Sequence, residues 1–260
     1  MVGFHYPPIG WARHELRSRK VMSPLRRPLL IVIAASGLVA AVAALAMLGF
    51  WQLDRARQKQ AMLDAVEHVL QQRRPVAMTR VLDRASSDFA WAEVNGRFAA
   101  PLIFLDNQQH QGRAGLRLYA PLALPGQPTR LLVDMGWLPW PAGRVLPAIQ
   151  LPDAPVTLAG LLAPPPSVGL RVGDAPSGRQ TPLLVTRLDP AELSAQGDVR
   201  YAARVLRLDP ALPLGYARDL DVLPNTLPPE RHRGYAAQWF ALAASLFTLV
   251  LWRQLRKKTS

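Results

Sequence analysis

The chain has 260 residues, of which 50% are hydrophobic and 19% charged, and it contains 25 prolines and no cysteine. The absence of cysteine excludes disulfides, thiolate metal sites, cysteine nucleophiles and covalent c-type heme attachment. The formal net charge is +13, and ten of the 31 Lys and Arg residues lie within residues 1–27 or after Trp252, beside the two most apolar segments. Basic residues in these positions indicate contact with a lipid bilayer and argue against nucleic acid as the partner.

The first apolar segment, residues 29–53, contains no charged residue. At about 1.5 Å per residue, roughly 20 helical residues cross the ~30 Å hydrocarbon core of a bilayer. We therefore predict a transmembrane helix over residues 29–51, ending at the interfacial Trp51, after a cytoplasmic segment of residues 1–28. The alternative is a signal peptide cleaved after residues 44–46 (Ala-Leu-Ala), but the apolar run exceeds the usual signal core of about 7–15 residues.

The next segment is also predicted to be helical, although it is polar. Leu63, Val66 and Leu70 recur at helical spacing over residues 54–72, and Pro75 ends the pattern. We expect this helix to continue the first span out of the membrane and to lead into a domain of residues 52–233.

Beyond Pro75 the pattern changes to short alternating or apolar runs separated by Pro and Gly, which is typical of β-strands. These runs predict an antiparallel barrel or a sandwich-like domain. Residues 163–182 include three successive prolines and several glycines and are predicted to form a mobile loop. The predicted strands are residues 91–98, 102–105, 116–119, 130–133, 156–162, 183–187 and 203–208, with a turn or bulge at Gly136-Trp137 and a short helix at 190–195.

The second charge-free run, residues 234–252, is just long enough to span a bilayer. Tyr235 and Trp239 at one end and Trp252 at the other form an aromatic belt, and a basic tail of residues 253–260 follows. Basic flanks stay on the cytoplasmic side, so both termini should be cytoplasmic and the central domain periplasmic. The predicted fold class is a multi-pass membrane α+β protein of a bacterial inner membrane, in which two transmembrane helices flank a mainly antiparallel β domain.

Small residues of the second span share one helical face. Ala237, Ala241 and Ser245 recur at four-residue spacing, and small residues let helices approach closely in lipid. The two spans could pair through this face, or the pattern reflects ordinary alanine usage.

The sequence contains no G-x-S-x-G, P-loop, dinucleotide-binding or H-E-x-x-H motif that would indicate an enzyme. Among the remaining polar residues, His232 is the strongest candidate for a binding role. It lies just before the second span, and His232, Tyr235 and Trp239 share one helical face at i, i+3 and i+7. Imidazole is a common axial ligand of heme iron, and an aromatic face can pack against a porphyrin. The alternative is a polar interfacial residue that caps the span.

A second polar face lies at the matching depth on the first helix. Gln52, Arg55 and Lys59 share this face. Its cations could meet heme propionates or lipid phosphates. The alternative is a solvated polar face where the span ends.

Several short motifs occur in order from residue 48 to the second span. They are residues 48–55 (Leu-Gly-Phe-Trp-Gln-Leu-Asp-Arg) with Lys59, 96–98 (Gly-Arg-Phe), 105–107 (Leu-Asp-Asn), 112–113 (Gly-Arg), Gly115, 119–122 (Tyr-Ala-Pro-Leu), 132–137 (Leu-Val-Asp-Met-Gly-Trp), Pro139, His232 and 235–239 (Tyr-Ala-Ala-Gln-Trp). With these motifs the chain resembles the surfeit locus protein 1 family of cytochrome c oxidase assembly proteins. It departs from the family pattern at Asp134-Met135, where Asn-Arg is usual, at Glu230-Arg231, where Asn-Asn is common, and at Gln108, where Arg is frequent.

The resemblance implies an assembly factor for heme-copper cytochrome c oxidase (complex IV), not an enzyme. It implies that the protein handles heme a for the catalytic subunit, with subunit I or its assembly intermediates as partner. It also implies that His232 ligates the heme iron. The other predicted heme contacts are Tyr235, Trp239, Trp51, Gln52, Arg55 and Lys59. The alternatives are a heme-free scaffold that stabilises an oxidase subunit and a membrane-anchored periplasmic enzyme.

Overall fold

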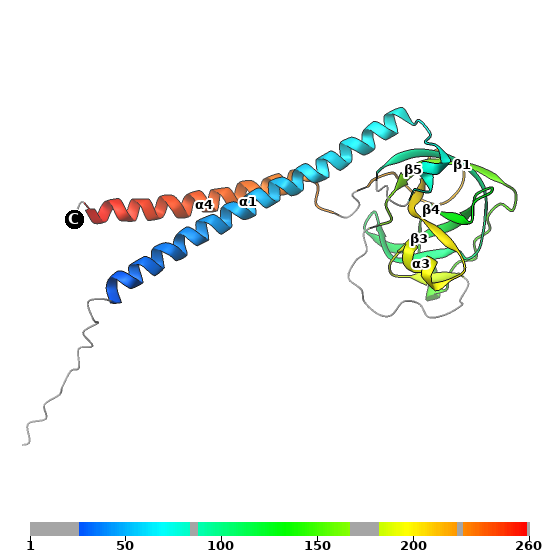
Figure 1. Ribbon diagram of the computed structural model, residues 1–260. Coiled ribbons are helices and arrows are strands. Elements are labelled where there is room, and N and C mark those ends of the chain that lie inside the picture. The colour runs from blue at the N-terminus through cyan, green and yellow to red at the C-terminus, as the bar shows by residue number, and fades with distance from the viewer. Residues whose placement is uncertain (1–25, 84–87, 167–181, 223–225, 259–260) are drawn as a thin grey trace, which may run out of the picture. The chain divides into compact units, whose positions relative to one another are not determined.

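The structure is a computed structural model that describes residues 26–83, 88–166, 182–222 and 226–258 (Figure 1). The chain divides into two compact units. The helical unit comprises Met1–Gln52 and Gly234–Ser260, and the domain unit comprises Leu53–Arg233.

Two long helices lie near the ends of the chain, as predicted. Helix α1 (Arg26–Gln72) and helix α4 (Pro229–Lys258) are both long and apolar enough to cross a membrane. The helix predicted over residues 54–72 is confirmed as the continuation of α1. It ends at Gln72, three residues before Pro75. Proline has no backbone N–H to donate to a helix, and it disfavours helical geometry in the residue before it.

Within the helical unit, α1 and α4 pack against each other through a glycine and an aromatic ring. A Cβ atom at Gly49 would lie 2.6 Å from the Phe240 ring, so the ring packs on bare backbone. The rings of Phe50 and Phe240 also meet edge to face, with centroids 5.1 Å apart. Helix pairing is thus present, but the predicted contact face is wrong. Ala237, Ala241 and Ser245 are all exposed, whereas Ala236 and Ala243 are buried.

The domain unit is built on one seven-stranded sheet in the order β1-β5-β7-β4-β3-β2-β6. Strand β1 also pairs with β3, so β1, β5, β7, β4 and β3 close into a barrel, which confirms the barrel rather than the sandwich. Pairing is mainly antiparallel, with β4–β7 and β2–β6 parallel. The strands are β1 (Ala90–Phe98), β2 (Ile103–His110), β3 (Arg113–Ala123), β4 (Thr129–Pro139), β5 (Val156–Ala163), β6 (Leu183–Val185) and β7 (Arg200–Leu208).

The short elements agree less closely with the predictions. Helix α3 (Pro190–Gln196) confirms the short helix, and the Asp189 carboxylate caps it by accepting from the amides of Ala191 and Glu192. Helix α2 (Met78–Val81) and a 3-10 turn (Ala142–Arg144) were not predicted. Strands β2, β3 and β4 are longer than predicted, and β6 is shorter. Most of the predicted loop 163–182 lies outside the described residues, while Ala163 is the last residue of β5.

Alternation along the strands separates two hydrophobic clusters. Leu118 of β3 and Val133 of β4 belong to the larger cluster, which fills the barrel and also takes in Val81 of α2. Tyr119 and Leu132, the adjacent residues on the same strands, point to the opposite face and join the second cluster. There β6 and α3 cover the outside of the barrel. The domain therefore has two buried faces, and polar residues on the outer face are enclosed as well.

A β-bulge interrupts the pairing of β3 with β4 between Gly136 and Asp134. Gly136 has φ of 104°, and the segment 216–217 packs directly on it. Met135 O accepts a hydrogen bond from Tyr216 N at 2.7 Å, and Trp137 N donates to Ala217 O at 2.7 Å. The predicted turn or bulge is thus a bulge, and it ties the chain after β7 to the middle of β4.

Gly136→Ala should destabilise the protein strongly. The backbone conformation alone costs about 1–3 kcal/mol for a residue with Cβ, and the new Cβ would lie 2.8 Å from the carbonyl oxygens of Tyr216 and Ala217. Gly126→Ala is the matched control, because Gly126 has φ of 68° with nothing within 4 Å, and it should cost only about 1 kcal/mol. Urea unfolding of the full chain, followed by tryptophan fluorescence, measures both. Equal losses would contradict a role for the 216–217 contact.

Candidate functional site

The predicted heme contacts fall into both structural units. Trp51, Gln52, Tyr235 and Trp239 belong to the helical unit, and Arg55, Lys59 and His232 belong to the domain unit. In the helical unit, the Trp51 and Tyr235 side chains are 51% and 40% exposed. Gln52 and Trp239 are half-buried. The Trp51 and Tyr235 side chains thus expose part of their apolar surface.

His232 is brought next to the predicted cations in the domain unit. It is 8% exposed, and it is the one buried histidine among the three that the structure describes. The Lys59 ammonium donates to the Leu227 carbonyl, and Arg233 Nη2 donates to Gln60 Oε1 at 3.4 Å, so residues 59–60 lie beside the start of α4. Lys59 and Arg55 act electrostatically on the imidazole. Burial, together with these positive neighbours, lowers the pKa of His232 and so favours the neutral imidazole, which is the form that binds a metal.

The motifs of the family resemblance mostly build the fold. Asn107 has φ of 61° in a β2 bulge, and the preceding Asp106 Oδ1 accepts from Trp140 Nε1 at 2.8 Å and from the Asn107 amide at 2.7 Å. A Cβ on Gly96 would lie 2.6 Å from the Ala123 carbonyl oxygen, where β1 meets β3 to close the barrel. These residues are therefore needed for strand pairing, and they leave His232 and the outer face of the barrel as candidate binding groups.

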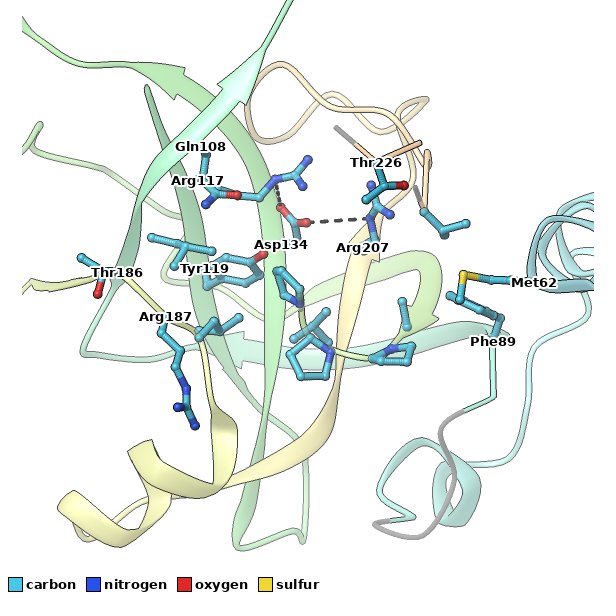
Figure 2. A pocket seen from close by; sticks show the side chains of 18 of the residues that line it. Met62, Phe89, Gln108, Arg117, Tyr119, Asp134, Thr186, Arg187, Arg207 and Thr226 are labelled. Carbon is cyan, nitrogen blue, oxygen red and sulfur yellow. Dashed lines mark ion pairs between the residues drawn. The ribbon is translucent and has the colours of Figure 1, made fainter. Parts of the chain in front are cut away.

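The outer face of the barrel holds a buried polar row that sequence reasoning missed (Figure 2). Tyr119, Asp134 and Arg207 occupy paired positions on the adjacent strands β3, β4 and β7. Arg117 lies two residues before Tyr119 and therefore on the same face of β3. In the sequence, this row could have been recognised only from single charged residues inside otherwise apolar strands. Placing them side by side requires the strand register, which the sequence pattern does not contain.

Asp134 is the centre of this row. Its side chain is 4% exposed, and Oδ1 lies 3.2 Å from Arg117 Nε while Oδ2 lies 3.9 Å from Arg207 Nε. Oδ1 also accepts from the Gly136 amide at 3.1 Å. Arg207 is held from its other side, since Nη1 donates to the Asp221 carbonyl at 2.6 Å and Nη2 to the Asp219 carbonyl at 3.1 Å. Burial lowers the pKa of Arg207 from its ordinary value, yet a guanidinium remains charged at neutral pH.

Tyr119 is fully buried, and its hydroxyl has no hydrogen-bond partner within the described residues. Burial, together with the nearby Asp134 carboxylate, raises the pKa of Tyr119 well above its ordinary value. The hydroxyl therefore stays protonated and can donate. A buried hydroxyl without a partner normally costs stability, so its presence here needs an explanation from function or structure.

These side chains line one wall of a cavity of about 590 Å³ in the domain unit (Figure 2). The polar wall is formed by Arg117, Tyr119, Asp134 and Arg207, with Gln108 beside them. The other walls are mainly apolar. The remaining lining residues are Met62 and Lys59 of α1, Phe89, Leu105, Ala163, Pro164, Pro165, Pro166, Thr186, Arg187, Leu188, Val205, Val222 and Thr226.

Asp134→Ala should destabilise the protein more than Asp134→Asn. Alanine removes both the charge and the acceptor atoms that face Arg117, Arg207 and the Gly136 amide, which costs about 3–5 kcal/mol. Asparagine keeps an oxygen acceptor for the Gly136 amide and should cost only about 1–2 kcal/mol. Urea unfolding of the full chain compares the two variants. Losses of the same size would show that the acceptor oxygen retained by asparagine does not matter to the fold.

The architecture combines two apolar helices, each long enough to cross a membrane, with a closed β-barrel domain. The SURF1 family model matches residues 39–244, from within the first apolar stretch of α1 into the second half of α4. The chain therefore belongs to the SURF1 family, which is associated with cytochrome c oxidase assembly and is not known as an enzyme family. A search of the curated proteins finds no match.

Proposed function

We propose that this protein is an assembly factor of the bacterial inner membrane that holds heme a as cargo for subunit I of cytochrome c oxidase. Family membership supports the link to oxidase assembly. The observation that carries the heme proposal is His232, a buried imidazole at the start of an apolar helix, with Lys59 and Arg55 acting on it. An imidazole with cations around it matches a ligand that has a metal centre and carboxylate side groups.

Each residue in this group has a distinct proposed role. His232 supplies the nitrogen ligand, and Arg55 and Lys59 pair with the propionates. The Lys59 ammonium now donates to the neutral Leu227 carbonyl, and a carboxylate is a stronger acceptor. Trp51, Gln52, Tyr235 and Trp239 remain predicted contacts of the macrocycle. Heme a supplies the chemistry of the finished oxidase, so the assembly factor needs only to bind, orient and release it.

The membrane placement is part of the proposal. Helices α1 and α4 have the required length and apolar composition, and ten basic residues flank the apolar runs at the two chain ends. This distribution supports a hairpin with both termini in the cytoplasm and the barrel in the periplasm. His232 and Lys59 would then lie at the periplasmic surface of the inner membrane.

Single cysteines test this orientation cleanly, because the chain has none of its own. Ala154→Cys, at an exposed position of the domain, should react with a membrane-impermeant maleimide on intact spheroplasts. Ser260→Cys should react only after the spheroplasts are lysed. The cysteine-free protein is the control and should stay unlabelled in both samples. The reverse labelling pattern would contradict the proposed orientation.

Removing the imidazole tests the heme proposal. Protein purified from cells that make heme a should show a Soret band, and His232→Ala should lower the heme bound per protein by tenfold or more. A tenfold loss corresponds to about 1.4 kcal/mol of binding free energy. His68→Ala is the matched control, because His68 is exposed on α1 and should leave heme occupancy unchanged. Full heme occupancy in His232→Ala would refute ligation by His232.

The heme-free scaffold gives a different result in the same preparation. It predicts that subunit I co-purifies with the protein while no Soret band appears, whichever heme the cells make. Both measurements on one sample therefore separate heme handling from scaffolding.

A further inference from the structure

We propose that the cavity on the outer face of the barrel binds an amphipathic anion, with a carboxylate or phosphate group held by Arg117, Arg207 and Tyr119. This site goes beyond the proposed heme function, because none of its three binding groups belongs to the heme contacts. Lys59 also lines the cavity and is the one residue common to both sets. The apolar part of the ligand would lie against the apolar walls (Figure 2).

The charge of the polar wall is the first argument. Two largely buried guanidinium groups face one buried carboxylate, that of Asp134. The second acid near Arg207 is Asp219, whose side chain is half exposed and 3.4 Å away. Arg187, at the edge, has its own partners in Asp189 and Glu192. Among the buried groups the two guanidiniums outnumber the one carboxylate, and buried cations are costly unless they are paired, so this wall favours an anion over a cation.

Unused hydrogen-bond donors are the second argument. The Tyr119 hydroxyl has no acceptor within the described residues, and Arg117 Nε is close to Asp134 without hydrogen-bond geometry. Arg117 otherwise donates no hydrogen bond in the described part of the chain. A guanidinium with free N–H groups beside a hydroxyl matches the several acceptor atoms of a carboxylate or a phosphate.

The shape and lining of the cavity are the third argument. A volume of about 590 Å³ lies in the range of small-molecule sites. Met62, Phe89 and Leu188 give the cavity apolar lining, together with the three prolines 164–166. A small inorganic ion would leave these walls in contact with water. A ligand with an anionic head and an apolar body fills both parts, and a fatty carboxylate, a heme propionate edge and a lipid phosphate all share this chemistry.

The test uses the full-length protein in a non-ionic detergent and three probes, namely hexanoate, hexyl phosphate and neutral 1-hexanol. Calorimetric titration should show binding of at least one anion and at least tenfold weaker binding of hexanol. Preference for hexanoate identifies a carboxylate ligand, and preference for hexyl phosphate identifies a lipid headgroup. Equal binding of hexanol and both anions, or no binding of either anion, would overturn the proposal.

Variants locate the binding in the cavity. Arg117→Met should weaken anion binding at least tenfold, whereas Arg113→Met, an exposed position on the same strand, should not change it. Arg117→Met could fail to fold because it leaves Asp134 underpaired, so Tyr119→Phe is the second variant. It should weaken binding several-fold while the ligand-free protein unfolds at the same or a higher temperature, since the hydroxyl has no partner to lose. Unchanged affinity in Tyr119→Phe would refute the assigned site.

The proposed heme site and the cavity can fail independently. His232→Ala should bind hexanoate or hexyl phosphate as the unmodified protein does, even where it has lost heme. If His232→Ala abolished anion binding, the cavity would not be a separate site. If heme were retained in that variant, the heme proposal would fail and the cavity would remain.

Discussion

The position of β4 between β3 and β7 is the constraint on which the domain depends. Antiparallel pairing on one side and parallel pairing on the other place Tyr119, Asp134 and Arg207 in one row across three strands. The parallel pair needs a long connection, and β5, β6 and α3 lie within it. The same connection supplies the cover of the outer face, so the segment that links β4 to β7 also buries the charged row.

Asp134 links this row to the bulge in β4. Its carboxylate accepts from the Gly136 amide and lies close to both arginines, while the segment after β7 pairs with the bulge and holds Arg207 through the carbonyls of Asp219 and Asp221. The carboxylate thus supplies both the oxygen that the bulge requires and the negative charge that faces the two arginines. The cavity therefore rests on a rigid part of the fold, where unused donors can be held in place.

The main features of the two long helices follow from local sequence, in contrast to the register of the strands. Their length and apolar composition are local properties, and so is the spacing that places His232 one helical turn from Tyr235. Their pairing is not local. Small residues on one face suggested a close contact, but the structure packs the Phe240 ring on the bare backbone of Gly49 instead. Shape complementarity between a ring and a glycine depends on both helices, so the pattern of one helix could not reveal it.

The sequence by itself determined the two apolar helices, the α1 extension, the positions of most strands, the capped helix at Pro190 and the family, because these depend on local periodicity, turn residues and ordered motifs. It also singled out His232, Arg55 and Lys59, since their spacing along two helices is short-range information. Only the tertiary structure decided which strands pair and in which register. Arg117, Tyr119, Asp134 and Arg207 are up to 90 positions apart, and only that register places their side chains on one buried face.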